Sequence, residues 1–162
     1  MYFLLLSEFD NSFDTLSGLY NRATFEKAAK QIEKQKTFTV IVIDINDFKI
    51  VNDTYGHNYG DSVINSIAVI LKESLDNRYT CYRVGGDEFF ILSKETNKDK
   101  IEYHLKKIID TLSEKRTIDS RLPTIAYGYS VFQGDKKPDF QKILKEADDQ
   151  MYYFKNLHKT SH

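Results

Sequence analysis

The amino-acid sequence predicts an α+β domain in which helices cover a central, mostly antiparallel sheet. Three observations lead to this fold class. Apolar residues recur with helical spacing in separate stretches, apolar β-branched runs alternate with those stretches, and a Gly-Gly turn joins two runs into a hairpin. The 162 residues contain no internal repeat and no Pro-, Gly- or Ser-rich linker, so they are expected to form one domain.

The first half of the chain is expected to form a helix, a strand and a second helix. Residues 25–32 and 64–75 carry apolar side chains three or four positions apart, as helices do when one side faces a core. Between them, residues 38–45 are almost continuously apolar and β-branched, which is typical of a central strand covered on at least one face.

The second half begins with the hairpin. Residues 79–84 and 88–92 are expected to be its strands, and they flank the turn Gly85-Gly86-Asp87. After the hairpin come a helix, a strand and a last helix, at residues 101–112, 124–132 and 140–154.

The composition excludes several classes of protein. A formal net charge of −1 provides no basic field for nucleic acid or for an anionic membrane surface. The single cysteine, Cys81, excludes an intrachain disulfide and argues against a thiolate metal cluster, which fits a cytoplasmic location. Residues 1–13 are expected to be a lead-in, either a packed segment or a remnant of an upstream linker. Their apolar start is too short to span a bilayer and lacks the basic residues of a secretory signal.

Two carboxylates have the placement expected of a metal site. Asp44 ends the apolar run of residues 40–43, where a charged side chain is costly unless a basic residue or a cation accompanies it. Asp87 lies at the tip of the Gly-Gly hairpin, where glycine lets a ligand approach the backbone closely. If the hairpin lies beside the first strand, the two carboxylates converge. Hard oxygen ligands and substrate phosphates together form a typical Mg²⁺ site, with Mn²⁺ as the alternative cation.

The segment from residue 44 to residue 61 is dense in polar side chains and glycines, which is poor material for a core helix. Lys49 offers a cation for phosphate, while Asn52 and Asp61 offer an amide and a carboxylate for the edge of a base. Two interpretations follow from the residues alone. The segment is either part of a metal–nucleotide site or a solvated polar loop in which Asp61 caps a helix that begins near Ser62.

Several motifs resemble those of one enzyme family. Residues 84–89 read Val-Gly-Gly-Asp-Glu-Phe, the signature of GGDEF domains, whose members are diguanylate cyclases. The opening residues 14–22 and the Phe-Lys, Asn-Asp, Gly-His and Gly-Asp pairs of residues 48–61 also resemble the family. So does the closing stretch 147–155. The stretches occur in the family's order and spacing, and residues 14–162 are identified as a GGDEF domain.

The resemblance implies a fold like that of nucleotide-cyclase and polymerase palm domains, with a ferredoxin-like core. It implies condensation of two GTP molecules into cyclic di-GMP and pyrophosphate, by metal-assisted attack of a 3′-hydroxyl on an α-phosphate. Asp44, Asp87 and the backbone carbonyl of Ile45 become the Mg²⁺ ligands, and Glu88 joins the two aspartates as a catalytic residue. The alternative is a non-catalytic GTP-binding signalling module.

Further residues match the family's substrate contacts. Asn52 and Asp61 would recognise guanine, because a carboxylate accepts hydrogen bonds from its N1–H and amino groups, which adenine cannot offer together. Lys159 stands where the family commonly has an arginine, so it keeps the positive charge but loses the bidentate fork. The other substrate contacts that the resemblance implies are Lys49, Phe48, Gly85, Gly86 and Lys155.

The resemblance also bears on regulation and assembly. Many relatives carry an Arg-x-x-Asp product site shortly before the signature, but residues 76–79 read Asp-Asn-Arg-Tyr, so no inhibitory product site is expected. Because one domain holds one GTP, a homodimer is needed for catalysis. The other expected partner is an upstream sensor or receiver domain that is absent from this chain. The expected location is the cytoplasm, where this domain would form the cytoplasmic end of a membrane sensor.

Overall fold

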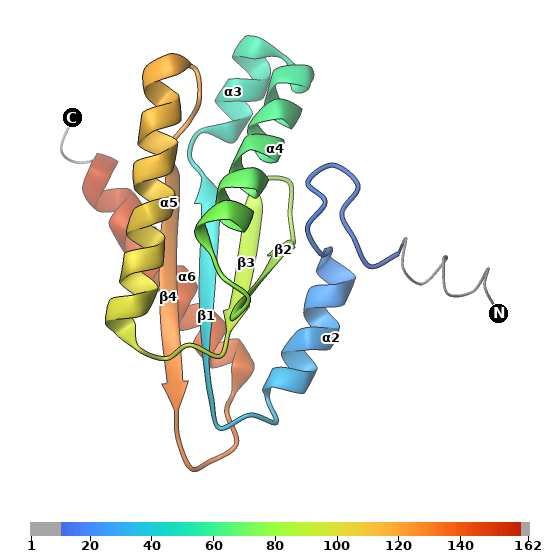
Figure 1. Cartoon of the computed structure of the whole chain (residues 1–162), viewed down its shortest axis with the longest axis vertical. Coiled ribbons are helices and arrows are strands. Elements are labelled where there is room, and N and C mark those ends of the chain that lie inside the picture. Colours follow the sequence, from blue (N-terminus) through green and yellow to red (C-terminus); the bar gives the residue numbers. More distant parts are fainter. Residues whose placement is uncertain (1–10, 160–162) are drawn as a thin grey trace.

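Helices and strands are interspersed along residues 11–159, the part of the chain that the computed structural model describes. Figure 1 shows them in chain order, coloured from blue to red. They are α2 (Arg22–Ile32), β1 (Thr37–Ile45), α3 (Phe48–Tyr55), α4 (His57–Ser74), β2 (Tyr79–Arg83), β3 (Glu88–Ser93), α5 (Lys98–Ile118), β4 (Ile125–Gln133) and α6 (Phe140–Lys159).

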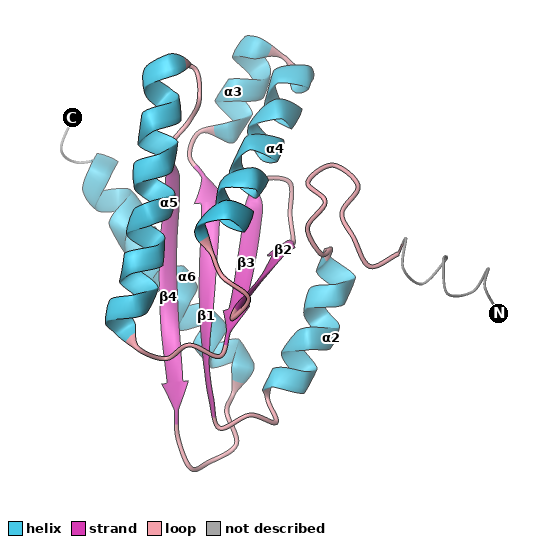
Figure 2. Cartoon of the chain, viewed as in Figure 1, coloured by secondary structure: helices cyan, strands magenta, loops and turns pink. Residues whose placement is uncertain are grey.

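The strands form one four-stranded sheet in the order β2-β3-β1-β4 (Figure 2). Every neighbouring pair in this sheet is antiparallel. Helices lie in front of the sheet and behind it, so the prediction of an α+β fold with helices covering an antiparallel sheet is confirmed.

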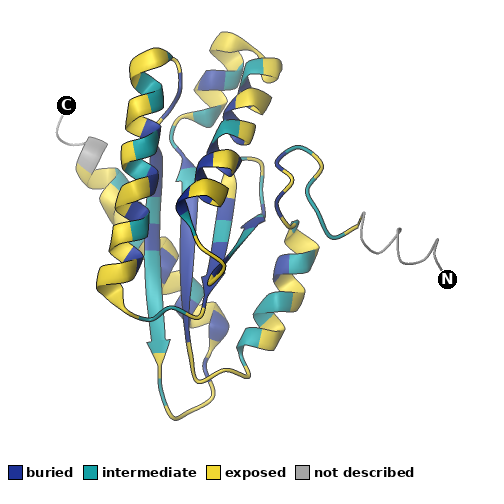
Figure 3. Ribbon diagram, in the orientation of Figure 1, coloured by how far each residue is buried: buried dark blue, intermediate teal, exposed yellow. Residues whose placement is uncertain are grey.

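Two apolar cores lie on opposite faces of the sheet (Figures 1 and 3). Ile41, Ile43 and Ile45 belong to the core that β1 shares with α4 and α5, while Val40 and Val42 belong to the core shared with α2 and α6. Successive side chains of a strand point to opposite faces, so a strand buried on both faces must be apolar at nearly every position. This arrangement explains the continuous apolar run of β1.

The polar segment of residues 44–61, whose composition is poor material for a core helix, nevertheless contributes to two helices. The helices α3 and α4 follow each other directly, with Gly56 between them at a φ of 89°. Val51 is buried and Phe48 packs against the same core, so α3 has an apolar side despite its polar composition. The alternative interpretation of this segment, a solvated polar loop, was therefore wrong. Asp61 lies inside α4, which begins well before Ser62, so the capping alternative was wrong too.

The chain before α2 lies against the edge strand β2. The backbone N–H of Arg83 donates to the carbonyl of Tyr20 (2.8 Å), and the Arg83 guanidinium donates to both carboxylate oxygens of Asp14 at 3.1 Å. Residues 1–10 of the expected lead-in lie outside the described residues. None of the helices in the described residues is both long and apolar enough to cross a bilayer.

Candidate active site

Three carboxylates meet at one end of the central strands. Asp44 lies directly opposite Glu88 in the ladder between β1 and β3, and the backbone N–H of Ile45 donates to the carbonyl of Asp87 (3.1 Å). The hairpin therefore lies beside the end of β1, which is the condition under which Asp44 and Asp87 converge. Residues far apart in the chain thus form one acidic cluster.

Burial and the closeness of these carboxylates raise the pKa of two of them. Burial raises the pKa of Asp87 above its usual range, and the nearby charge of Asp44 adds to the effect. Burial also raises the pKa of Glu88, and the charges of Asp44 and Asp87 raise that pKa further. A cation among the three would lower both pKa values, because an opposite charge favours the ionised form.

Asp44 has one oxygen paired and one unpartnered. The Lys155 ammonium of α6 donates to Asp44 Oδ2 at 2.8 Å. Oδ1 is buried and accepts no hydrogen bond from the described residues. A carboxylate oxygen is the kind of ligand that Mg²⁺ prefers, so this site fits a divalent cation. No three His, Cys, Asp or Glu side chains in the described residues form a metal site by themselves, so backbone and substrate oxygens would have to complete the coordination.

A second polar cluster lies where α3 packs on α4. Asn52 belongs to α3, and its side chain lies so close to Gly60 of α4 that a Cβ on Gly60 would be 1.8 Å from Asn52 Oδ1. Gly60 directly precedes Asp61, so the structure brings the Asn52 amide close to the backbone that carries the Asp61 carboxylate. This pair of side chains can both donate and accept hydrogen bonds.

The turn before α3 offers backbone N–H groups to a ligand. Asp47 has a left-handed conformation, with a φ of 56° and a ψ of 31°, and its side chain makes no capping hydrogen bond. The N–H groups in the first turn of a helix have no partner within the helix and favour anions. The backbone at Asp47 and Phe48 can therefore hold a phosphate. Lys49 lies exposed in the same turn.

The remaining residues of the expected substrate site differ in their surroundings. Neither Gly85 nor Gly86 has a positive φ, so the turn does not require glycine for its backbone angles. A Cβ on Gly86 would meet no atom within 4 Å, which leaves space for a ligand to approach the hairpin. Lys159 ends α6, and its side chain lies outside the described part of the structure.

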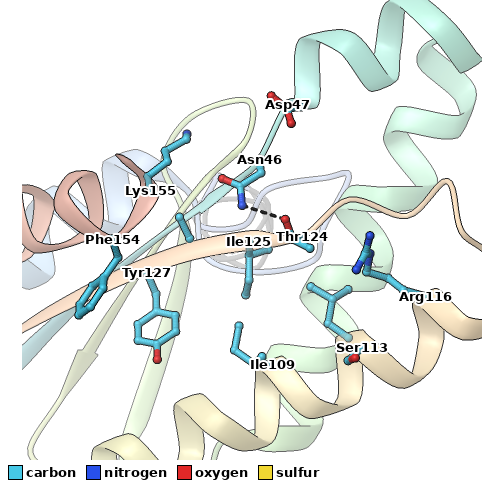
Figure 4. A pocket seen from close by; sticks show the side chains of 12 residues that line it. Asn46, Asp47, Ile109, Ser113, Arg116, Thr124, Ile125, Tyr127, Phe154 and Lys155 are labelled. Carbon is cyan, nitrogen blue, oxygen red and sulfur yellow. Dashed lines mark hydrogen bonds between the residues drawn. The ribbon is translucent and has the colours of Figure 1, made fainter. Parts of the chain in front are cut away.

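A pocket of about 680 Å³ lies beside the turn before α3 (Figure 4). Asn46, Asp47 and Lys155 line it together with apolar side chains of α5, β4 and α6. Arg116 of α5 also lines this pocket, and the sequence-based predictions did not include it. A signal was present, because Arg116 continues the apolar stripe of residues 101–112 at a position where an apolar side chain is expected.

Residues 11–161 match the family profile described as "Diguanylate cyclase, GGDEF domain". The chain belongs to the GGDEF family. This GGDEF domain is 31% identical over 154 residues to the diguanylate cyclase VdcA of Vibrio cholerae, a match that covers 91% of this chain and 45% of that protein. It is 32% identical over 157 residues to the protein YhcK of Bacillus subtilis, covering 90% and 43%. The chain therefore spans less than half the length of these curated relatives.

Solved structures give the same family. The coiled coil and GGDEF domain of DgcB from Caulobacter crescentus, in complex with c-di-GMP, matches with a TM-score of 0.83 and 25% identity over 96% of this chain and 86% of that chain. The similarity confirms the palm-like α+β fold that the resemblance implied.

Residues 76–79, which lack the Arg-x-x-Asp pattern expected of a product site, make other contacts in this GGDEF domain. Asp76 Oδ1 accepts a hydrogen bond from the backbone N–H of Arg78 (2.9 Å), and the Arg78 guanidinium pairs with Glu95 at 2.8 Å. The Tyr79 ring packs against His104, with ring centroids 4.9 Å apart. The lack of an inhibitory product site stays a prediction.

Proposed function

We propose that this GGDEF domain condenses two GTP molecules into cyclic di-GMP. The 3′-hydroxyl of each GTP attacks the α-phosphate of the other, so that each new P–O bond replaces the bond to a departing pyrophosphate. The observation that carries the proposal is the cluster of Asp44, Asp87 and Glu88, which contains a buried carboxylate oxygen without a partner in the described residues.

Asp44, Asp87 and the backbone carbonyl of Ile45 would hold Mg²⁺, or Mn²⁺ in its place. A divalent cation bound there supplies charge neutralisation at the α-phosphate and at the leaving pyrophosphate. Lys155 lies next to this site, because its ammonium donates to Asp44 at 2.8 Å. Its charge therefore also favours a bound phosphate. Lys49, which follows Asp44 in the sequence, and Lys159, which follows Lys155, are proposed to add positive charge.

Glu88 is the proposed acceptor of the proton from the 3′-hydroxyl. Its carboxylate lies beside Asp44 and Asp87, and a cation held by these two would keep Glu88 ionised and able to accept a proton. Transfer of a proton to such a positioned carboxylate is general base catalysis. Glu88 begins β3 opposite Asp44, so the proton acceptor and the phosphate site lie on neighbouring strands.

Asn52 and Asp61 are proposed to select guanine. The Asp61 carboxylate accepts from the guanine N1–H and amino groups, and the Asn52 amide can donate to an acceptor on the base. Adenine would leave the half-buried Asn52 amide and the exposed Asp61 carboxylate without these partners, so it is expected to bind less tightly than guanine.

The complete site is proposed to need two copies of the chain. One domain offers one guanine site, so the second GTP must come from a partner copy in a homodimer. Because the chain spans less than half the length of its curated relatives, an upstream sensor or receiver domain that controls this pairing is part of the proposal. We propose that the domain is located in the cytoplasm, as the cytoplasmic end of a membrane sensor.

Mass-spectrometric analysis of the products tests the proposed activity. Concentrated protein with Mg²⁺ is expected to form cyclic di-GMP from GTP and no cyclic product from ATP. The rate per molecule is expected to rise with protein concentration, because two copies must meet. An Asp87→Ala variant serves as the negative control. Specific GTP binding without release of pyrophosphate, even with Mn²⁺, would instead identify a non-catalytic GTP-binding module.

A Gly60→Ala variant is expected to weaken guanine binding without unfolding the domain. The new Cβ would occupy the place of the Asn52 amide oxygen, and a side-chain end can rotate away at little cost to the fold. Alanine also has a higher helix propensity than glycine, so the change should not destabilise α4. Loss of the Asn52 contact is expected to reduce GTP affinity roughly tenfold, measured by calorimetric titration.

The matched control for this prediction is Asn52→Ala. The two changes act on one contact, so the double variant is expected to bind GTP about as weakly as either single variant. Additive losses would show that Gly60 acts on the site by another route.

A further inference from the structure

Arg116 has an unusual environment for a charged residue. It is half-buried on the core-facing side of α5, and its Nε donates to the backbone carbonyl of Leu122 at 2.8 Å. No carboxylate among the described residues forms an ion pair with it, whereas Arg22, Arg78, Arg83 and Arg121 are all paired. The hydrogen bond to Leu122 orients the guanidinium of Arg116, and its remaining N–H groups have no carboxylate among the described residues to accept from them.

The pocket beside Arg116 is also the one that the phosphate-binding groups line. Lys155 and Arg116 approach it from α6 and α5, and Asn46 and Asp47 lie on its rim between them (Figure 4). Asn46 is held in place, because its side-chain Nδ2 donates to Thr124 Oγ1 at 2.9 Å and its backbone N–H donates to the Thr124 carbonyl at 2.9 Å. Two cations and the uncapped start of α3 thus surround one opening.

We infer that Arg116 binds the terminal phosphate of the triphosphate. The inference rests on the proposed function, since it assumes that GTP occupies the turn before α3. Lys155 shares its charge with Asp44, so the far end of the triphosphate needs a cation of its own. A guanidinium can donate two parallel hydrogen bonds to a phosphate, which an ammonium cannot do. Arg116 thereby supplies the bidentate fork that Lys159 lacks.

Binding of the mono-, di- and triphosphates of 3′-deoxyguanosine tests this inference without turnover, because these nucleotides lack the attacking hydroxyl. Calorimetric titration of the Arg116→Ala variant is expected to show a loss of triphosphate affinity of roughly tenfold to hundredfold. Monophosphate affinity is expected to stay within about twofold, because the guanine contacts are unchanged. Arg116→Lys should keep the positive charge and lose the bidentate guanidinium. Its triphosphate affinity should therefore lie between that of Arg116→Ala and that of the wild type.

Lys115→Ala is the matched control, because it removes one positive charge from the same turn of α5 without touching the pocket. Its triphosphate affinity should match the wild type. Equal losses for all three nucleotides, together with a lower melting temperature, would show that Arg116 only supports Leu122 and would overturn the inference. An unchanged ratio of triphosphate to monophosphate affinity in Arg116→Ala, or no nucleotide binding by the wild type, would also overturn it.

The proposed cyclase activity is judged separately by the cyclic di-GMP product. Selective loss of triphosphate binding in Arg116→Ala, in a protein that forms no product, would support the role of Arg116 and refute the cyclase.

Discussion

An Asp87→Asn variant is expected to form cyclic di-GMP at a rate lower by on the order of 10³-fold or more and, in EDTA, to melt at a higher temperature than the wild type. The loss of activity follows from removing a proposed cation ligand. The gain in stability follows from the raised pKa of Asp87, which means that the folded protein disfavours the ionised carboxylate. Asparagine keeps the shape of the side chain and removes its charge from the neighbourhood of Asp44 and Glu88.

The pH dependence of melting gives the sign of this effect. A carboxyl group whose pKa is raised on folding binds its proton more tightly in the folded state than in the unfolded state. Its contribution to stability is therefore full below the ordinary pKa of 3.8 and is lost as the pH rises through the higher folded value. The difference in melting temperature between Asp87→Asn and the wild type should thus widen as the pH rises from about 4 toward neutrality.

Asp135→Asn is the control for this experiment, because it removes the same charge from an exposed loop outside the cluster. Its melting temperature should follow the wild type at every pH. Addition of Mg²⁺ should raise the melting temperature of the wild type more than that of Asp87→Asn. A variant that melts below the wild type in EDTA at neutral pH would contradict the view that repulsion dominates at Asp87.

The central strand β1 and the core-facing helices could be predicted from the sequence because their apolar patterns are long and regular, whereas the short strand β2 was predicted from the Gly-Gly turn that follows it. The run of residues 38–45 is a case in point, since burial on both faces of β1 leaves almost no polar position in it. The segment with α3 could not be predicted in the same way. Its apolar side rests on Val51 and Phe48 within a single short helix, and the surrounding polar residues obscure so brief a pattern.

The candidate site shows a similar limit. The convergence of Asp44 and Asp87 could be expected once the hairpin was placed beside the first strand, because ladder register then decides which residues are neighbours. The pairing of Lys155 with Asp44 depends on where α6 crosses the sheet, which no local pattern specifies. For Arg116, the helical spacing already marked a charged side chain at an apolar position, but only the packed structure shows that this position lines the pocket of Asn46 and Lys155.

A Gly128→Ala variant is expected to be destabilised by about 3 kcal/mol, because α6 packs on β4 at this residue without room for a side chain. A Cβ on Gly128 would lie 2.1 Å from the carbonyl oxygen of Ala147 and 2.5 Å from the backbone nitrogen of Met151. Both contacts are with the backbone of α6, so no side-chain rotation can relieve them and the helix itself must move. For a domain of this size, such a loss corresponds to a fall in melting temperature of roughly 10 °C.

Displacement of α6 should also reach the active site, because the same helix carries Lys155 to Asp44. At a temperature where Gly128→Ala is still folded, its cyclase rate is therefore expected to be roughly tenfold lower than that of the wild type, because the ammonium of Lys155 is displaced from the phosphates. Gly134→Ala is the matched control, since the nearest atoms to its Cβ would be those of the Phe132 side chain, at 3.2 Å or more, and not the backbone of α6. The prediction would be contradicted if Gly128→Ala had the same melting temperature as Gly134→Ala and kept full activity. That result would mean that α6 can move away from the sheet at little cost in stability, and that the close packing of β4 on α6 does not position Lys155.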